Sequence, residues 1–164
     1  MMQQSSSTYI GLGGNLGDVR ASFAQALAAM DSWADSALEA VSGIYLNPPI
    51  GPVDQPDYLN AVAALRTMRS PLALLSALQA LERDAGRVFG GRRWGPRVLD
   101  LDLLLYDNRQ IDEAQLKVPH PSLHRRAFVI HPLAEIAPQV MVPGHGSVAS
   151  IAARIDASTL TRLP

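Results

Sequence analysis

Residues 98–106 limit what the chain can fold into more than any other segment. The segment is apolar except for Asp100 and Asp102. In an extended strand alternate residues face the same way, so the two carboxylates lie on one face, ~7 Å apart along the backbone. The opposite face would be filled by Leu99, Leu101, Leu103 and Leu105. The segment therefore predicts a strand with one apolar face and one face that carries two charges.

Helices and further strands are predicted around this strand. Apolar residues spaced three and four apart predict a helix after Asp18 and another after Ser70, each of which is a favourable N-cap. In the second helix a leucine stripe is expected to be buried, and Glu82 is expected on another face. Strands are predicted at residues 8–12, 41–46 and 58–65, with a hairpin return through Ile111 and short helices at residues 123–128 and after Ser147. This mixture predicts an α+β fold with a largely antiparallel sheet flanked by helices.

Length and composition restrict the class of protein. The 164 residues suit one domain, predicted over residues 1–164 with residues 1–7 flexible. The 48% hydrophobic content is enough for a core without disulfides, and the chain has no cysteine. With 14 basic and 15 acidic residues, binding to nucleic acid through overall charge is disfavoured. No apolar run approaches the ~18 residues of a membrane span, so we expect a cytoplasmic protein without membrane association.

The basic residues are unusual in kind and in position. Only Lys117 of the 14 basic residues is a lysine. Five arginines gather near glycines, at Arg83, Arg87, Arg92, Arg93 and Arg97. A coding bias toward arginine would explain the overall excess but not this clustering. Because guanidinium groups match phosphate oxygens, the cluster favours a phosphate-facing loop over residues 86–96.

Familiar nucleotide and metal motifs are missing or weak. The segment Gly11-Leu12-Gly13-Gly14-Asn15-Leu16 lacks the third glycine of a dinucleotide fingerprint and is better explained as a tight turn. Lys117 is not preceded by a phosphate-binding glycine loop. His120 and His124 are four apart, but Pro121 disfavours the helix that a zinc pair would need. His120 could still contact an anion.

Two patches on predicted strands could bind substrates. Asp100 and Asp102 follow Gly95-Pro96-Arg97, so candidate Mg²⁺ ligands adjoin an arginine loop, which suggests phosphoryl transfer. The alternative is an ordinary solvent-exposed strand face. Tyr58 and Asn60 lie on one face of their strand, where a ring and an amide suit a planar heterocycle. The alternative there is a simple cross-strand pair.

Together these motifs resemble those of the 6-hydroxymethyl-7,8-dihydropterin pyrophosphokinase family. The signature is Arg93-Trp94-Gly95-Pro96-Arg97-Val98-Leu99-Asp100-Leu101-Asp102-Leu103-Leu104. Supporting matches are Gly13-Gly14-Asn15-Leu16-Gly17, Pro49-Ile50-Gly51-Pro52, Asp54-Gln55-Pro56-Asp57-Tyr58-Leu59-Asn60, Val118-Pro119-His120-Pro121 and Arg126-Ala127-Phe128. The resemblance implies a ferredoxin-like fold, transfer of pyrophosphate from ATP to the pterin's hydroxymethyl oxygen with release of AMP, and a monomer.

The resemblance also implies roles for individual residues. Two Mg²⁺ ions would bind Asp100 and Asp102, and Arg87, Arg97 and Asp102 would be catalytic. ATP-binding positions would be Gln79, Glu82, Arg87, Arg97, Leu103, His120 and Arg126. Pterin-binding positions would be Asn47, Pro48, Ile50, Tyr58, Asn60, Trp94 and Phe128, with the ring stacked between Tyr58 and Phe128.

Some positions depart from the family pattern. Asn47 stands where serine or threonine is common, Gly14 replaces a common serine, Phe89 replaces a basic residue of some relatives, and Lys117 replaces a residue that is often hydroxylic. These departures concern the loop over the reactants and the ribose contacts, not the reaction. Two alternatives stay open, an RNA-binding domain on a similar scaffold and a protein that binds pterin without turnover. The 5% aromatic content argues against the RNA-binding domain.

Overall fold

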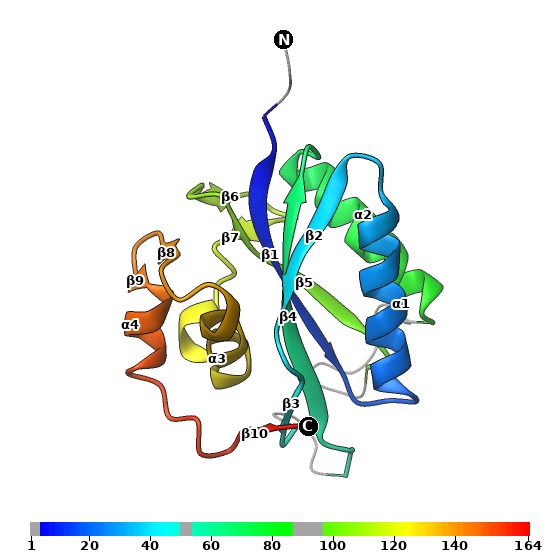
Figure 1. Cartoon of the computed structure of the whole chain (residues 1–164), viewed down its shortest axis with the longest axis vertical. Helices are drawn as coiled ribbons and strands as arrows, with labels where there is room; N and C mark the ends of the chain where they lie inside the picture. The colour runs from blue at the N-terminus through cyan, green and yellow to red at the C-terminus, as the bar shows by residue number, and fades with distance from the viewer. Residues whose placement is uncertain (1–3, 50–53, 87–96) are drawn as a thin grey trace.

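A six-stranded antiparallel sheet forms the centre of the molecule (Figure 1). The computed structural model describes residues 4–49, 54–86 and 97–164. The strands are β1 (Ser6–Gly14), β2 (Ser36–Val41), β3 (Tyr45–Asn47), β4 (Tyr58–Thr67), β5 (Asp100–Tyr106) and β10 (Thr161–Arg162). The order is β10-β3-β4-β1-β5, and β2 pairs with β4 on the same edge as β3, further along β4. Because β2 and β3 together take the place of one strand, the chain has the βαββαβ arrangement of a ferredoxin-like fold, as predicted.

Two helices cover one face of the sheet, α1 (Val19–Ser32) and α2 (Pro71–Asp84) (Figure 1). Asp18 and Ser70 cap them as expected, each accepting a hydrogen bond from a backbone N–H three residues on. The core under these helices contains Ile10, Met30, Leu65, Leu74, Leu78 and Leu101. These helices leave the opposite face of the sheet to other elements.

The opposite face is covered by the 3-10 helix η1 (Leu123–Arg125), α3 (Ala127–Ile136) and α4 (Val148–Ala152) (Figure 1). The sequence predicted one short helix at residues 123–128, but α3 continues for eight residues beyond Phe128. Pro132 lies inside α3 and by itself argues against a helix there. Burial of Ile130 and Leu133 in a second core outweighs that effect. Ser147 caps α4, as predicted.

A register shift changes the predicted faces of β5. Tyr9 pairs with Leu105 and Ile10 with Leu103, so Leu104 is an extra residue in the ladder. Leu103 packs under α1 and α2, whereas Leu104 and Leu105 both belong to the core beside α3. The prediction that Leu105 shares a face with Leu103 was therefore wrong, because strict alternation fails at a bulge. Asp100 and Asp102 precede the bulge and keep their common face.

The strand predicted at residues 41–46 is interrupted. Residues 42–44 separate β2 from β3, and the Ser42 hydroxyl accepts the Val62 N–H at 2.9 Å in place of a backbone carbonyl. The return through Ile111 also differs, because β6 (Ile111–Asp112) pairs with β7 (Lys117–Val118) and not with β5. A third small sheet joins β8 (Met141–Val142) to β9 (Gly146–Ser147).

The start of the chain is ordered earlier than expected. Ser6 and Ser7 pair with Thr67 and Arg66, so β1 begins inside the segment expected to be flexible. Within the described ranges, no helix has the length and apolar character that crossing a membrane requires.

Candidate active site

Strand register brings the two carboxylates level with the polar residues of β4. Gly13 on β1 lies opposite Asn60 of β4 on one side and Asp100 of β5 on the other. Gly11 likewise lies between Val62 and Asp102. Directly opposed residues of antiparallel strands point to the same face. Two parallel rows therefore cross the sheet on the face beside α3, each with a carboxylate at one end and a glycine in the middle.

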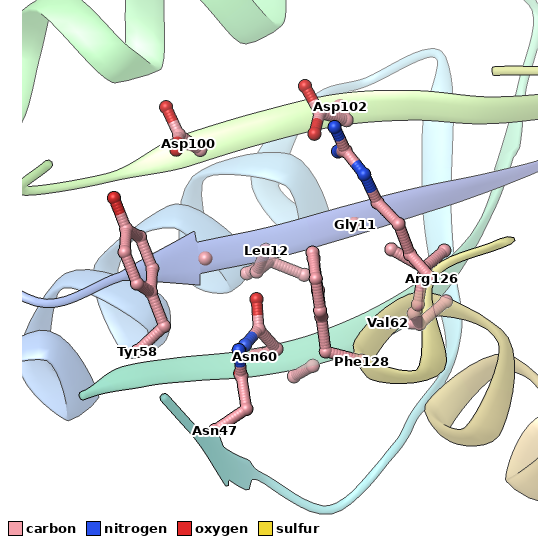
Figure 2. Close-up of a pocket in the computed structure, with 13 residues that line it drawn as sticks. Gly11, Leu12, Asn47, Tyr58, Asn60, Val62, Asp100, Asp102, Arg126 and Phe128 are labelled. Carbon is pink, nitrogen blue, oxygen red and sulfur yellow. The ribbon is translucent and has the colours of Figure 1, made fainter. Parts of the chain in front are cut away.

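The glycines make the floor of a pocket between these rows (Figure 2). A Cβ at Gly13 would lie 3.1 Å from Oδ1 of Asn60, closer than nearly all real Cβ contacts. A Cβ at Gly11 would lie 3.4 Å or more from the Leu104 side chain, an ordinary contact. The sequence predicts a strand that ends at Leu12, followed by a tight turn. In the structure β1 continues to Gly14, so Gly11 and Gly13 lie two apart on one strand face, where glycine leaves a depression in the sheet.

The acidic end of the pocket holds Asp100 and Asp102 (Figure 2). Both side chains are partly exposed, and the Arg97 Nε lies 4.0 Å from an Asp100 carboxylate oxygen. Carboxylate oxygens are the ligands that Mg²⁺ prefers, and Mg²⁺ commonly takes its remaining ligands from water and substrate phosphates. In the described part of the chain no three His, Cys, Asp or Glu residues form a metal-binding group. The two carboxylates thus fit a Mg²⁺ that also binds phosphate oxygens.

The opposite end of the pocket is lined by a phenol, two amides and a phenyl ring. Tyr58 and Asn60 come from β4, Asn47 from β3 and Phe128 from α3 (Figure 2). Asn60 is 6% exposed, and its amide nitrogen donates to Oδ1 of Asn47. The sequence placed Tyr58 and Asn60 on one strand face, and Asn47 and Phe128, which the resemblance adds to the pterin-binding positions, line the same pocket. Flat rings and amide groups at one end suit a planar heterocycle with polar edges.

Arg126 and His120 lie near the carboxylates. Figure 2 shows the Arg126 guanidinium pointing toward Asp102 and away from the amide end. The pKa of His120 is lowered mainly by burial, with Asp102 raising it and Arg126 lowering it further. Nδ1 of His120 accepts the Ser122 backbone N–H at 3.2 Å, which leaves the proton on Nε2. At neutral pH His120 is therefore a neutral hydrogen-bond donor, suited to an anion.

One buried asparagine joins the two loops that border the pocket. The Asn15 amide nitrogen donates to Oε1 of Gln55 at 3.0 Å and to the Pro56 carbonyl at 2.9 Å. Its amide oxygen accepts the Arg97 backbone N–H at 2.9 Å. The Arg97 carbonyl in turn accepts the Asn15 and Leu16 N–H groups. No local pattern predicts these hydrogen bonds, because the partners of Asn15 lie 40 or more residues away.

Other predicted ATP-binding residues lie outside this pocket. Gln79 and Glu82 are on α2, and the Leu103 side chain is in the core beneath that helix. Glu82 is buried at 3% exposed, and its carboxylate accepts the Leu101 N–H at 3.0 Å. It therefore fastens α2 to β5, although the sequence had placed it apart from the buried leucine stripe.

Of the remaining residues predicted to bind substrates, the structure describes Pro48, which is exposed just after β3. Ile50, Arg87 and Trp94 lie outside the described residues, as does most of the arginine loop. His124 stacks on His145 with ring centroids 3.8 Å apart.

The sequence is similar to one known family and to several of its members. Residues 9–138 match the model of the 7,8-dihydro-6-hydroxymethylpterin-pyrophosphokinase (HPPK) family. A Pseudomonas aeruginosa 2-amino-4-hydroxy-6-hydroxymethyldihydropteridine pyrophosphokinase is 44% identical, with 95% of this chain and 96% of the relative covered. A Haemophilus influenzae protein of the same name is 47% identical, with 84% of this chain and 85% of the relative covered.

Solved structures show the same fold. A Plasmodium falciparum HPPK-DHPS chain crystallised with pterin and p-hydroxybenzoate superposes with a TM-score of 0.75 at 10% identity. The match covers 97% of this chain and 47% of the solved chain, so the chain spans about half of that protein. An HPPK-DHPS in complex with substrates gives a TM-score of 0.71 at 12% identity. Together with the family match and the close relatives, this places the chain in the HPPK family.

Proposed function

We propose that the protein transfers the pyrophosphoryl group of ATP to the hydroxymethyl oxygen of 6-hydroxymethyl-7,8-dihydropterin, a step of folate biosynthesis. The observation that carries this proposal is the pair of rows across the sheet. They put two carboxylates and a polar end with Asn60 into one pocket, with Gly11 and Gly13 between them. The substrates are those of the family to which the chain belongs.

The reaction follows from the two ends of this pocket. The hydroxymethyl oxygen attacks the β-phosphorus of ATP and loses its proton, and the bond from that phosphorus to the α,β-bridging oxygen breaks. AMP leaves with the bridging oxygen, and the product is the pterin diphosphate. Binding both substrates on one rigid sheet face holds the attacking oxygen near the phosphorus, which removes much of the entropic cost of a two-substrate reaction.

The amide end would bind the pterin. Tyr58 and Phe128 supply rings for stacking, while Asn60 and Asn47 present amide groups to the polar edge of the heterocycle. Backbone groups near Pro48 and Ile50 would complete this edge, and Trp94 would cover the substrates. The hydrogen bond between the two asparagines supports the assignment, because it fixes which amide atoms remain for a ligand.

The acidic end would bind magnesium and the triphosphate. Asp100 and Asp102 would hold two Mg²⁺ ions, which when bound neutralise phosphate charge and orient the triphosphate for in-line attack. Arg97 and Arg126 lie at this end as cations, and His120 offers Nε2–H. Burial lowers the pKa of Arg126, but an arginine starts so high that it stays charged at neutral pH. These groups would stabilise the charge that develops on the transferring phosphate.

The predicted nucleotide-binding residues on α2 would act from the face of the sheet opposite the pocket. Glu82 fastens this helix to β5, which supports a role for Gln79 and Glu82 in shaping the site for the nucleoside. The Leu103 side chain is in the core, so its contact would use the backbone. Arg87 would close over the phosphates together with Arg97. We further propose that the protein is a monomeric, single-domain, cytoplasmic enzyme.

An assay with a defined product tests the function. The protein, incubated with ATP, Mg²⁺ and the hydroxymethyl dihydropterin, should yield AMP and the pterin diphosphate. ADP as the product would point to simple phosphoryl transfer, and bound pterin without AMP would point to a binding protein. Light scattering on a sizing column checks the monomer, which a mass near twice 17.6 kDa would contradict.

A further inference from the structure

We propose that Glu135 is a positioning residue for the pterin, because it clamps β3 against α3 with the help of Arg162 on β10. This inference rests on the proposed pterin end of the pocket. It concerns residues outside that pocket, on the side of β3 away from the carboxylates.

Glu135 accepts hydrogen bonds from three residues in two separate segments. Its Oε2 accepts the Gly43 backbone N–H at 2.8 Å, and its Oε1 accepts the Tyr45 hydroxyl at 2.5 Å. The Arg162 guanidinium donates to the same carboxylate, at 3.0 Å from Nε and 3.4 Å from Nη2. These bonds draw the pKa of Glu135 down to about 2, with the Arg162 hydrogen bond as the largest cause. The carboxylate is thus charged and fully engaged at any physiological pH.

The clamp lies on the same face of β3 as the pterin end of the pocket. Tyr45 pairs with Asn60 and Asn47 pairs with Tyr58, so both residues of β3 face the pocket side of the sheet. Tyr45 is two residues before Asn47, and its hydroxyl ends on Glu135. Fixing Tyr45 therefore fixes where Asn47 meets Asn60.

The same residue also connects the second wall of the pocket. Glu135 and Phe128 are both on α3, with Phe128 at the pocket and Glu135 about two turns further along. The clamp consequently sets the distance between the helix that carries Phe128 and the strand that carries Asn47. A slot for a flat ring needs that distance to be constant.

Strand β10, the outermost strand of the sheet, completes the clamp beside β3 (Figure 1). Thr161 and Arg162 pair with Leu46 and Tyr45, and the Leu163 N–H donates to the Ile44 carbonyl at 2.8 Å. A Cβ at Gly43 would lie 2.7 Å from the Arg162 guanidinium. Glycine at this position lets the guanidinium lie directly on the strand. The edge of the sheet is therefore shaped to receive β10.

Steady-state kinetics with each substrate varied test the proposal. Glu135→Gln and Arg162→Ala should each raise the pterin KM by about three- to tenfold, since each removes a charged hydrogen bond that holds β3. The ATP KM should change by less than about twofold, because the acidic end is unaffected. A general loss of structure would affect both substrates, so the difference between the two KM values identifies a positioning role.

Gly43→Ala gives an independent test with Glu135 intact. Its methyl group would displace the Arg162 guanidinium and should raise the pterin KM in the same way. Glu39→Gln is the matched control. It removes the exposed Glu39–Arg66 ion pair, 3.2 Å long, from β2, which pairs with a different part of β4 from β3, and should leave both KM values unchanged.

The outcomes separate this inference from the function on which it rests. Asn60→Ala, which alters the pocket itself, must raise the pterin KM; if it does not, the pterin placement and the clamp both fail. If Asn60→Ala does so while Glu135→Gln and Gly43→Ala leave the pterin KM within about 1.5-fold of wild type, the clamp alone is refuted. Should Glu135→Gln not fold, Tyr45→Phe removes a single hydrogen bond of the clamp and decides in the same way.

Discussion

At the scale of single residues, the pocket depends on the absence of a side chain at Gly13. It lies between Asn60 and Asp100 in the sheet, where any side chain would occupy the pocket. Gly11 is at the equivalent position in the other row, but a Cβ added there would contact only the flexible end of the Leu104 side chain. We therefore expect an added methyl group to be tolerated better at Gly11 than at Gly13.

This difference gives a matched pair of variants. Gly13→Ala should push the Asn60 amide aside and raise the pterin KM by about tenfold, because an added methyl group only 3.1 Å from Oδ1 makes that amide shift. Gly11→Ala should change it by less than about threefold. Kinetics at saturating ATP measure both. Equal effects of the two variants would show that the contact with Asn60 is not what limits position 13.

Asp102 is the residue on which turnover should depend most. Asp102→Ala should lower kcat by at least about a hundredfold, because it removes a proposed magnesium ligand. The fold should be kept, since the side chain is partly exposed on the pocket face. Circular dichroism checks the fold and AMP release checks the rate. Retained activity would remove Asp102 from the metal site.

Arg97 should act on chemistry more than on pterin binding. Its guanidinium is at the acidic end, 4.0 Å from Asp100, while its backbone is fixed by Asn15. Arg97→Ala should therefore lower kcat by about a hundredfold with a pterin Kd close to wild type. Single-turnover rates and equilibrium binding measure the two quantities. An equally large loss of pterin affinity would contradict the assignment.

At the scale of elements, Asn15 connects β1 to the segments on both sides of the pocket. Asn15→Ala would leave the Arg97 N–H and the Pro56 carbonyl without their present partner in a buried place. Unfolding free energy should fall by about 2 kcal/mol, as expected for lost hydrogen bonds of a buried amide. Urea denaturation measures this, with Asn108→Ala in an exposed turn as control. A loss equal to that of the control would mean that the loops are held elsewhere.

The Glu135 clamp makes stability depend on pH in a defined window. Its carboxyl pKa is about 2 when folded, against an ordinary value of 4.5. A depressed acid stabilises the folded state above its unfolded pKa and loses that effect as pH falls toward the folded pKa. The free energy of unfolding of the wild type should thus exceed that of Glu135→Gln by about 1 kcal/mol above pH 4.5. The difference is this small because solvent screens the partly exposed pair of Glu135 and Arg162. The difference should vanish near pH 2. Urea denaturation at several pH values measures it, and a difference independent of pH would contradict the pairing.

At the scale of the whole molecule, substrate binding should stabilise the fold. The pocket is formed by β1, β3, β4, β5 and α3 together, so a ligand there binds only the folded chain. A non-hydrolysable ATP analogue with Mg²⁺ at a hundred times its Kd should add about 2.7 kcal/mol, or roughly 5–10 °C in Tm. Omitting Mg²⁺, or using Asp102→Ala, should abolish most of the shift. An equal shift without Mg²⁺ would place the triphosphate elsewhere.

Much of the molecule follows from local sequence patterns, and some of it does not. Caps at Asp18 and Ser70 and apolar spacing predicted α1 and α2, because those signals act within a few residues. The length of α3 and the break at Ser42 were missed, since each depends on packing or hydrogen bonds from distant segments.

The sequence by itself determined the chemistry that the protein can perform. Asp100 and Asp102 on one strand face, and Tyr58 with Asn60 on another, follow from the alternation of extended backbone. Only the tertiary structure decided how these pairs meet. Register sets Gly13 between Asn60 and Asp100, and no local rule fixes register between strands tens of residues apart. The same holds for Glu135, whose partners at Gly43 and Arg162 lie far away in the chain and become neighbours only when β10 joins the sheet.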